Sequence, residues 1–279
     1  MIGRRLVLLT ACALGIAALA PGANAVARLN PVQRTALAQA IAAPTRTPAN
    51  VLRDRYRHPA QTLAFFGVKP SDTVVEIWPS GGWYSEILAP YLALGGGAYI
   101  AAAPDDGLGG MRRLMGANPA AYGAIRTANF PILPASTPPV AGTPVASSSA
   151  DVVLTFRNVH NWMMSKQPFD AEAFRQMYAM LKPGGTLGVV EHRLDEPADP
   201  ARERDSGYVK TSTVRRLAEQ AGFRFVAASE INANAKDNRN HPEGVWTLPP
   251  SFALKDVDRA KYAAIGESDR MTLKFVKPR

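Results

Sequence analysis

Short apolar segments rich in β-branched residues alternate along this chain with segments of helical spacing, and this alternation limits the possible folds more than any other feature. Strands buried on both faces are expected at Thr73–Trp78, Ala98–Ala103, Asp151–Phe156 and Gly185–Val190. Chains in which strands alternate with helices form mostly parallel sheets with right-handed crossovers, and the helices cover both faces. The sequence therefore predicts an α/β fold built on one mostly parallel sheet.

The sequence signals for the other helices and strands differ in strength. Helices are expected at Val32–Ala42, His58–Phe66, Trp83–Leu94, Met111–Ile125, Ala171–Leu181 and Thr211–Gln220, and two more strands at Phe223–Ser229 and Met271–Val276. The third strand of the sheet is expected within the Pro-, Ser- and Thr-rich loop from 131 to 149. The segment Asn232–Asp269 separates the last two strands, and an insertion of this length predicts a lid or a binding loop, or else disorder. Its aromatic residues Trp246, Phe252 and Tyr262 favour order.

The first 25 residues are typical of a secretory signal peptide. Met1–Arg5 is basic, Leu6–Ala20 is an apolar run of 15 residues, and Ala23–Ala25 fits a small-residue cleavage site. The sequence thus predicts cleavage after Ala25 and a periplasmic or secreted protein. A lipoprotein processed at Cys12 is the alternative, and Cys12 is the only cysteine of the chain.

Composition excludes several classes of protein. Of the 279 residues, 47% are hydrophobic and 20% are charged, which excludes a disordered chain. No apolar run reaches the roughly 20 residues of a membrane span. The net charge is +9, but basic and acidic residues are interleaved, as in Arg202–Asp205, which favours a solvated surface over a nucleic-acid site. We expect a helical lead-in at 26–70, one domain at 71–279 and a small-molecule partner, and leave the oligomeric state open.

Polar and titratable residues gather at the ends of three expected strands. They are Glu76, Pro79, Gly81, Gly82, Trp83 and Tyr84 at the first strand, Arg157, Asn158, His160, Asn161 and Trp162 after the fourth, and Glu191, His192 and Arg193 after the fifth. In an open parallel sheet, ligands bind beyond the carboxyl ends of the strands, near the point where the strand order reverses. The sequence therefore predicts a ligand site at this edge.

The glycine turn after the first strand narrows the choice of ligand. It lacks the three spaced glycines of a dinucleotide fingerprint and the Gly-Lys-Ser/Thr of a phosphate loop, which argues against NAD and ATP. Two adjacent glycines, Gly81 and Gly82, allow a ligand to approach the main chain closely. Glu76 is expected to hold an amine or hydroxyl group, and Trp83 or Tyr84 to face a cation.

Four segments carry a likeness to a known family. They are Val75–Pro90, Asp151–Trp162, Leu181–Gly185 and Asp269–Pro278. With them the chain resembles the class I S-adenosylmethionine-dependent methyltransferases, particularly a bacterial group that carries secretion signals, over roughly residues 50 to 279. The resemblance implies a Rossmann-like fold with a mostly parallel seven-stranded sheet, and S-adenosylmethionine as cofactor.

The same resemblance suggests which residues hold the cofactor. The expected set is Glu76, Pro79, Gly81, Gly82, Trp83, Tyr84, Asp105, Arg157 and Asn158. The family places a carboxylate at the end of the second strand to hold the ribose hydroxyls, where this chain has Ala103, so Asp105 or Asp106 is expected to substitute. Methyl transfer needs alignment and, for a protonated acceptor, a base. His160 is the first candidate for that base, and Glu191 or His192 the second.

The sequence also permits two other functions. A secreted protein that kept this fold without catalysis would also account for Ala103. Histidines near turns permit a metal-dependent hydrolase or oxidoreductase with His160, His192, His241 and Glu191 as ligands, but the histidines lack short ligand spacing and we expect no metal. Arg157 is expected either to bind an acidic substrate or to pair with Glu191. Tyr208 is expected either in the pocket or in ordinary packing.

Overall fold

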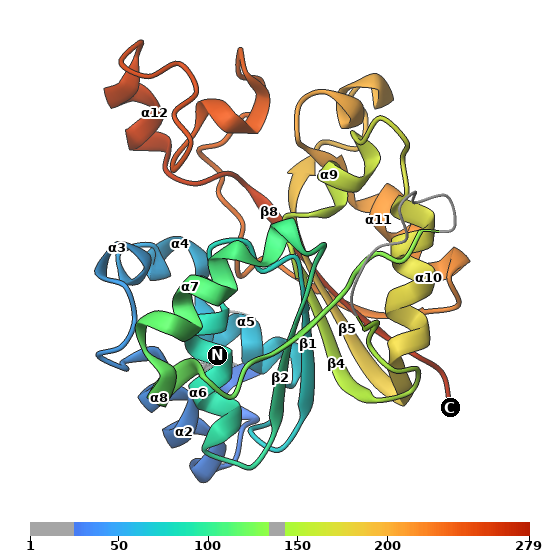
Figure 1. Ribbon diagram of the computed structural model, residues 1–279. Coiled ribbons are helices and arrows are strands. Elements are labelled where there is room, and N and C mark those ends of the chain that lie inside the picture. The colour runs from blue at the N-terminus through green and yellow to red at the C-terminus, as the bar shows by residue number, and fades with distance from the viewer. Residues whose placement is uncertain (1–24, 134–142) are drawn as a thin grey trace, which may run out of the picture.

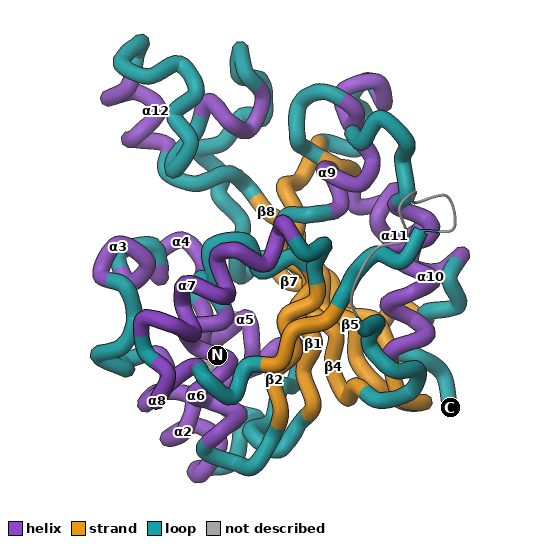
Figure 2. The backbone as a smooth tube through the Cα atoms, in the orientation of Figure 1, coloured by secondary structure: helices purple, strands orange, loops and turns teal. Residues whose placement is uncertain are grey.

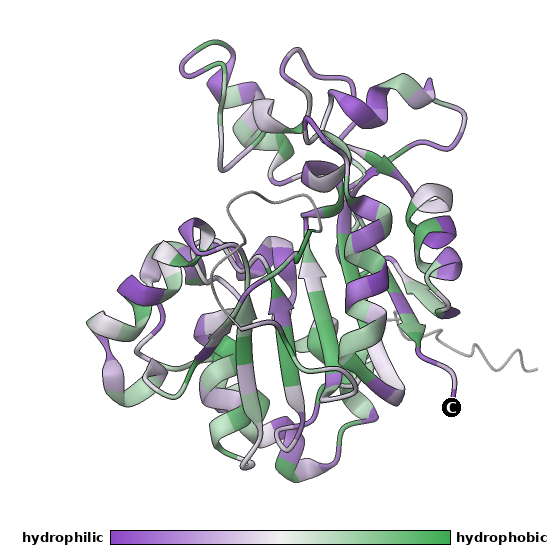
Figure 3. Ribbon diagram, turned by 45° about the vertical axis from the view of Figure 1, so that its right-hand side comes forward, coloured by the Kyte–Doolittle hydropathy of each residue, from purple (hydrophilic) through white to green (hydrophobic). Residues whose placement is uncertain are grey.

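The central strands are apolar on both sides because helices cover both faces of the sheet. The computed structural model describes residues 25–133 and 143–279. In β1 (Thr73–Ile77), Val74 packs into one hydrophobic cluster and its neighbour Val75 into another, on the opposite face. Hydrophobic residues are concentrated along the strands and on the helix faces that cover them (Figure 3). The predicted α/β fold with two covered faces is confirmed.

One sheet organises the described chain. Its strands are β1, β2 (Ala98–Ala102), β3 (Arg126–Ala128), β4 (Ala150–Phe156), β5 (Leu181–Leu194), β6 (Val209–Lys210), β7 (Arg224–Ser229) and β8 (Arg270–Val276). The order is β3-β2-β1-β4-β5-β8-β7, and β6 pairs with the end of β5. Only β8 runs antiparallel to its neighbours within this path. The strand order reverses between β1 and β4 (Figure 1).

Helices cover both faces of the sheet, and further helices lie beyond the edge at which its parallel strands end (Figure 2). They are α2 (Pro31–Ile41), α3 (Pro48–Val51), α4 (Asp54–Arg57), α5 (Pro59–Phe66), α6 (Ser85–Ala93), α7 (Gly109–Ala117), α8 (Pro119–Tyr122), α9 (Val159–Met163), α10 (Asp170–Met180), α11 (Thr211–Gln220) and α12 (Arg259–Ile265). Helices α2, α5 and α6 supply the cluster that contains Val74, and α10 and α11 the cluster that contains Val75.

The expected third strand was misplaced. Strand β3 covers Arg126–Ala128 and lies before the Pro-, Ser- and Thr-rich stretch, of which 134–142 lies outside the described residues. Two of its three residues are exposed, so it carries no apolar run that would predict a strand. The expected helix Met111–Ile125 is divided into α7 and α8, because Pro119 begins a new helix capped by the Asn118 side chain. The sheet also has eight strands, where seven were expected.

The N-terminal helices pack on the sheet domain. Asn30 and Gln33 form a capping box that begins α2, and α2 lies against α6. The Glu86 carboxylate on α6 accepts hydrogen bonds from the backbone N–H and the hydroxyl of Thr47, which fixes the start of α3. The predicted signal peptide falls largely on residues 1–24, outside the described residues. None of the helices in the described ranges has the length and apolar character needed to span a membrane.

Candidate functional site

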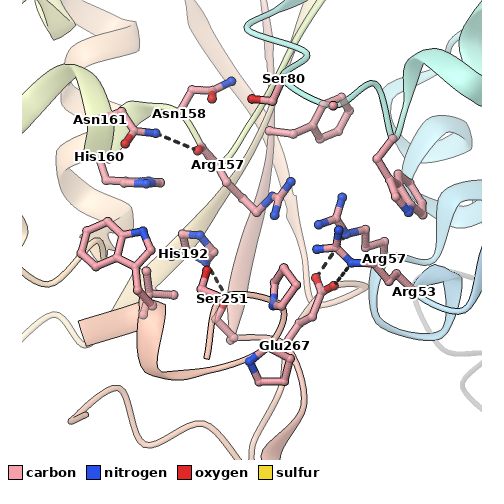
Figure 4. A pocket seen from close by; sticks show the side chains of 18 of the residues that line it. Arg53, Arg57, Ser80, Arg157, Asn158, His160, Asn161, His192, Ser251 and Glu267 are labelled. Atoms are coloured by element: carbon pink, nitrogen blue, oxygen red, sulfur yellow. Dashed lines mark hydrogen bonds and ion pairs between the residues drawn. The ribbon is translucent and has the colours of Figure 1, made fainter. Parts of the chain in front are cut away.

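A cavity of about 350 Å³, here called the main cavity, lies where the strand order reverses. Described residues from the α3–α4 segment, the turns after β1 and β4, strand β5 and the insertion line it (Figure 4). Ligands of open α/β sheets bind at such reversal points. The main cavity thus lies at the edge of the sheet where the sequence placed its ligand site.

Both turns that border the main cavity have left-handed backbone at residues other than glycine. After β1, φ is +51° at Trp78 and +53° at Ser80, and it is +62° at Arg157 directly after β4. Such conformations are costly for side-chain-bearing residues and concentrate at functional sites. The Asn158 amide ties the two turns together by donating to the carbonyl of Ile77 at 2.8 Å.

The two adjacent glycines have different roles. Gly81 lines the main cavity, and a Cβ atom there would have no neighbour within 4 Å, so its main chain is open to a ligand. Gly82 has a φ of +80°, and a Cβ there would lie 2.6 Å from Cε of Met111. Position 82 therefore requires glycine because of its left-handed backbone and its packing on α7. Gly81 leaves space for a ligand to approach the main chain.

A buried carboxylate orients one histidine of the main cavity. Glu191 is fully buried, and its Oε1 lies 2.9 Å from Nδ1 of His160 while its Oε2 accepts the backbone N–H of the same residue. The backbone N–H of His192 also donates to Oε1, at 2.8 Å. The carboxylate accepts the Nδ1 proton, so in the neutral tautomer of His160 the lone pair lies on Nε2. Nε2 has no hydrogen-bond partner among the described residues.

His192 lies beside His160, with ring centroids 5.2 Å apart. Its Nδ1 is hydrogen-bonded to Oγ of Ser268 in the insertion. Burial, together with the nearby charges of His160 and Arg157, lowers the pKa of His192 well below its usual range. One ligand-type atom from each of His160, Glu191 and His192 lies within 4.8 Å of the others, a spacing that could also hold a metal ion.

Three guanidinium groups line the main cavity. We call Arg53, Arg57 and Arg157 the arginine wall. Nε of Arg53 and of Arg57 donate to Glu267 at 2.6 and 3.2 Å, and Arg57 also lies over the ring of Trp83, 4.8 Å from its centroid. Trp83 was expected to face a cation, and in the structure that cation is the guanidinium group of Arg57.

Arg157 is the exception in the arginine wall. Its side chain extends between the two histidines and the Arg53–Arg57 pair (Figure 4), and it makes no hydrogen bond or ion pair with any described residue. Of the two roles expected for Arg157, pairing with Glu191 is therefore not observed. The binding of an acidic substrate stays a prediction. Burial and the nearby Arg270 lower the pKa of Arg157 from 12.5 to about 10.

The remaining expected site residues lie around the main cavity. Pro79, Trp83 and Asn158 line it. Glu76 is 3% exposed and accepts hydrogen bonds from the hydroxyls of Tyr99 and Ser85, so its carboxyl group is held within the core, where burial raises its pKa to about 7. The ring of Tyr84 stacks on Phe156. Glu76 and Tyr84 lie outside the set of described residues that line the main cavity.

Tyr208 and His241 belong to a neighbouring network. Both side chains are hydrogen-bonded to Asp237, at 2.9 Å from the Tyr208 hydroxyl and 2.8 Å from Nε2 of His241. Tyr208 therefore takes part in ordinary packing beside the insertion, and His241 is separate from the His160–Glu191–His192 cluster.

A second cavity of about 230 Å³ lies at the ends of the next strands. It is lined by Ala103 and Asp105 after β2 and by Asn129 after β3. The Asp105 carboxylate is largely exposed and ion-paired with Arg112. The second cavity therefore offers an acidic side chain close to Ala103.

Sequence reasoning missed half of the main cavity. Arg53 lies in the turn between α3 and α4 and Arg57 ends α4, both in the N-terminal lead-in, and Glu267, Trp246 and Ser251 come from the insertion. The insertion was expected to be a lid or binding loop, and Trp246, Phe252 and Tyr262 were the signal for an ordered one. The arginines gave no signal, because single basic residues on a helix are normally solvated.

Comparisons with known proteins identify the fold. No protein-family model matches this sequence, and no curated protein matches it. Among solved structures, it is similar to a methyltransferase dependent on S-adenosylmethionine from Aquifex aeolicus, with a TM-score of 0.53 at 14% identity, over 83% of this chain and 94% of that one.

Two further structures show how varied this fold is in function. A candidate sarcosine dimethylglycine methyltransferase from Galdieria sulphuraria has a TM-score of 0.53 at 14% identity, covering 82% of this chain and 86% of that one. The cyclase SpnF has a TM-score of 0.52 at 13% identity, covering 88% and 96%. The chain has the Rossmann-like fold of the class I methyltransferases. At such identities the likeness establishes the fold alone, so the reaction has to be argued from the site.

Proposed function

We propose that the protein is an S-adenosylmethionine-dependent methyltransferase acting on a small molecule. The observation that carries the proposal is the pairing of an open main chain at Gly81 with a carboxylate-oriented histidine, His160, in one cavity at the strand reversal. In this fold the reversal point is where a nucleotide-type ligand binds. A base beside the open turn is what a protonated methyl acceptor requires.

The residues present fit the cofactor. The space that a Cβ of Gly81 would enter is empty, which leaves the main chain accessible to the methionine end. The second cavity at Ala103 and Asp105 would take the nucleoside, with Asp105 as acceptor for ribose hydroxyls. Bound there, S-adenosylmethionine would supply an electrophilic methyl group.

The chain's own part in the reaction is positioning and proton transfer. Glu191 holds Nδ1–H of His160 in one direction, so Nε2 is fixed as the proton acceptor for an O–H or N–H group in the main cavity. Trp246 from the insertion lies 6.0 Å from the ring of His160, centroid to centroid, and contributes to excluding water there.

Calorimetric titration with S-adenosylmethionine and S-adenosylhomocysteine tests this function. We expect micromolar binding that Gly81→Leu abolishes, because a side chain would enter the open space. Gly116→Leu is the matched control, since Gly116 is an exposed helical glycine that also has no neighbour within 4 Å. No binding at millimolar ligand would favour the alternative, a binding protein that kept the fold without catalysis.

The His160–Glu191–His192 cluster supports a second candidate function. Two histidines and a carboxylate are a common ligand set for catalytic metals, so a metal-dependent hydrolase or oxidoreductase is the competing enzyme class. Stoichiometric metal in protein purified without an affinity tag, lost in His192→Gln, would favour this class. Metal-free protein that binds S-adenosylmethionine would favour the methyltransferase.

We further propose that residues 1–25 act as a signal peptide and that the insertion 232–269 acts as a lid over the domain 71–279. The signal peptide is tested by the N-terminal sequence of protein recovered from the periplasm, which should begin at Val26. A start at a lipid-modified Cys12 would indicate a lipoprotein instead.

A further inference from the structure

The main cavity holds more positive than negative charge. The arginine wall contributes three guanidinium groups, while Glu267 is the carboxylate among the described lining residues. Glu267 is also bound by Arg270, at 2.9 Å, so its charge is shared among three arginines. Although burial acts to raise the pKa of Glu267, Arg270, Arg57 and Arg53 together lower it to about 2. One carboxylate cannot neutralise this wall.

Donor groups of the arginine wall are left without acceptors. Nη2 of Arg53 and Nη2 of Arg57 are buried and have no hydrogen-bond partner, and Arg57 is only 2% exposed. Arg157 has no side-chain partner at all among the described residues. Buried donors without acceptors are rare in folded proteins, and such a group often marks a ligand position.

The geometry holds these donors in place. Arg57 is fixed by Glu267 on one side and by the Trp83 ring on the other, and the left-handed backbone of Arg157 directs its side chain into the main cavity (Figure 4). Planar guanidinium groups bind carboxylates and phosphates through paired N–H donors. Two such groups facing one space therefore form an oxyanion site.

The cofactor alone does not account for this charge. The amino-acid end of S-adenosylmethionine carries one carboxylate and one ammonium group, and its sulfonium adds a further positive charge. Bound S-adenosylmethionine would thus increase the positive charge of the main cavity. A second molecule that carries a negative charge would offset this excess.

We propose that the methyl acceptor is a small acid whose carboxylate or phosphate group binds Arg157 and Arg57, with its nucleophilic oxygen or nitrogen at His160. The inference that this molecule is the acceptor rests on the proposed methyltransferase function. The oxyanion site itself rests only on the arginine wall. The same chemistry could be supplied by the carboxylate of the cofactor, so the experiment has to separate the two sources.

Calorimetric titration of the purified protein with malonate, inorganic phosphate and the neutral analogue malonamide tests the site. Each titration is run without and with saturating S-adenosylhomocysteine. We expect malonate or phosphate to bind in both conditions and malonamide in neither. Arg157→Asn should weaken anion binding at least about tenfold, the loss expected for one charge-assisted contact. Arg175→Asn, which removes an exposed arginine of α10, should leave it unchanged.

A second variant distinguishes loss of the oxyanion site from loss of folding. Arg57→Lys keeps a positive charge beside Glu267 but removes the paired donors, so it should also weaken anion binding while circular dichroism and the melting temperature remain near those of the parent. Failure of both anions to bind at about 10 mM, where even a 1 mM site would be mostly filled, would overturn the proposal.

The outcomes also distinguish an acidic acceptor from the carboxylate of the cofactor, and the oxyanion site from the methyltransferase function. If S-adenosylhomocysteine displaces malonate, and Arg157→Asn weakens S-adenosylhomocysteine but not 5′-methylthioadenosine, the arginine wall holds the cofactor's carboxylate and the acidic acceptor is refuted. If anions bind but no adenosyl ligand does, the oxyanion site stands and the methyltransferase function falls.

Discussion

Replacing Arg157 with asparagine should make the protein more stable. Burial and Arg270 lower the pKa of Arg157 from 12.5 to about 10, and at about 1.4 kcal/mol for each tenfold change this disfavours the charged form by about 3 kcal/mol. Because the pKa in the folded state lies below that of the unfolded chain, this cost is fully present at pH 7. It is relieved only as the pH rises above about 10. Asparagine removes the charge and tolerates the φ of +62°.

Part of that gain is offset by lost packing. Asparagine lacks two of the methylene groups of arginine, each contributing up to about 0.8 kcal/mol when buried. The net expectation is a gain of about 1–2 kcal/mol in the free energy of unfolding, seen as a melting temperature higher by roughly 2–6 °C for a chain of this size. Urea unfolding at pH 7 and thermal unfolding, both without added anions, measure it.

Arg193 provides the matched contrast for this experiment. It is ion-paired with Asp269 at 2.8 Å and with Glu230 at 2.8 Å, and these partners raise its pKa. Its charge therefore stabilises the folded state, and Arg193→Asn should cost about 2 kcal/mol or more. If Arg157→Asn also destabilised the protein by more than about 1 kcal/mol, the Arg157 guanidinium would have a partner in the folded chain. The reasoning that it awaits a ligand would then be refuted.

Three further predictions follow from the site and the core. His160→Gln should lower kcat by about 10²–10⁴-fold while the affinity for S-adenosylhomocysteine changes little, and a loss of affinity at unchanged kcat would contradict its role as base. Burial and the nearby charges lower the pKa of His192, so below about pH 6.5 the unfolded chain binds more protons than the folded one. The free energy of unfolding should therefore fall as the pH is lowered from about 7 to 5. His192→Gln should flatten this slope in urea unfolding, and an unchanged slope would contradict the role of His192. Gly188→Ala should cost about 1–3 kcal/mol, because a Cβ there would lie 2.7 Å from Leu154 and 2.8 Å from Phe66, whereas Gly116→Ala should not; equal stabilities would show that the core can adjust.

The strands that are buried on both faces could be predicted closely from sequence. Segments such as Asp151–Phe156 have no polar face, so their apolar runs match β1, β2 and β4 within one residue. Strand β5 extends four residues beyond the predicted segment at each end. Strand β3 could not be found in this way. It has three residues, two of them exposed, and it is held only by its pairing with β2. A strand defined by its neighbour rather than by its own side chains has no sequence signal.

The site was predictable only in part for a similar reason. Arg157 and His160 follow β4, and His192 lies near the end of β5, so the topology alone brings them to one edge of the sheet. Arg53 and Arg57 reach the same cavity from the N-terminal helices, through packing that no local pattern encodes. Glu76 shows the opposite case, because a carboxyl group near a strand tip can point into the core and bind Tyr99 and Ser85.

A crystal structure of the complex with S-adenosylhomocysteine tests the central claim most directly. The account predicts the adenosine over Ala103 and Asp105 and the sulfur in the main cavity beside Gly81, with Nε2 of His160 facing the space that ends at Arg157. A ligand bound elsewhere, or with its sulfur turned away from His160, would contradict it.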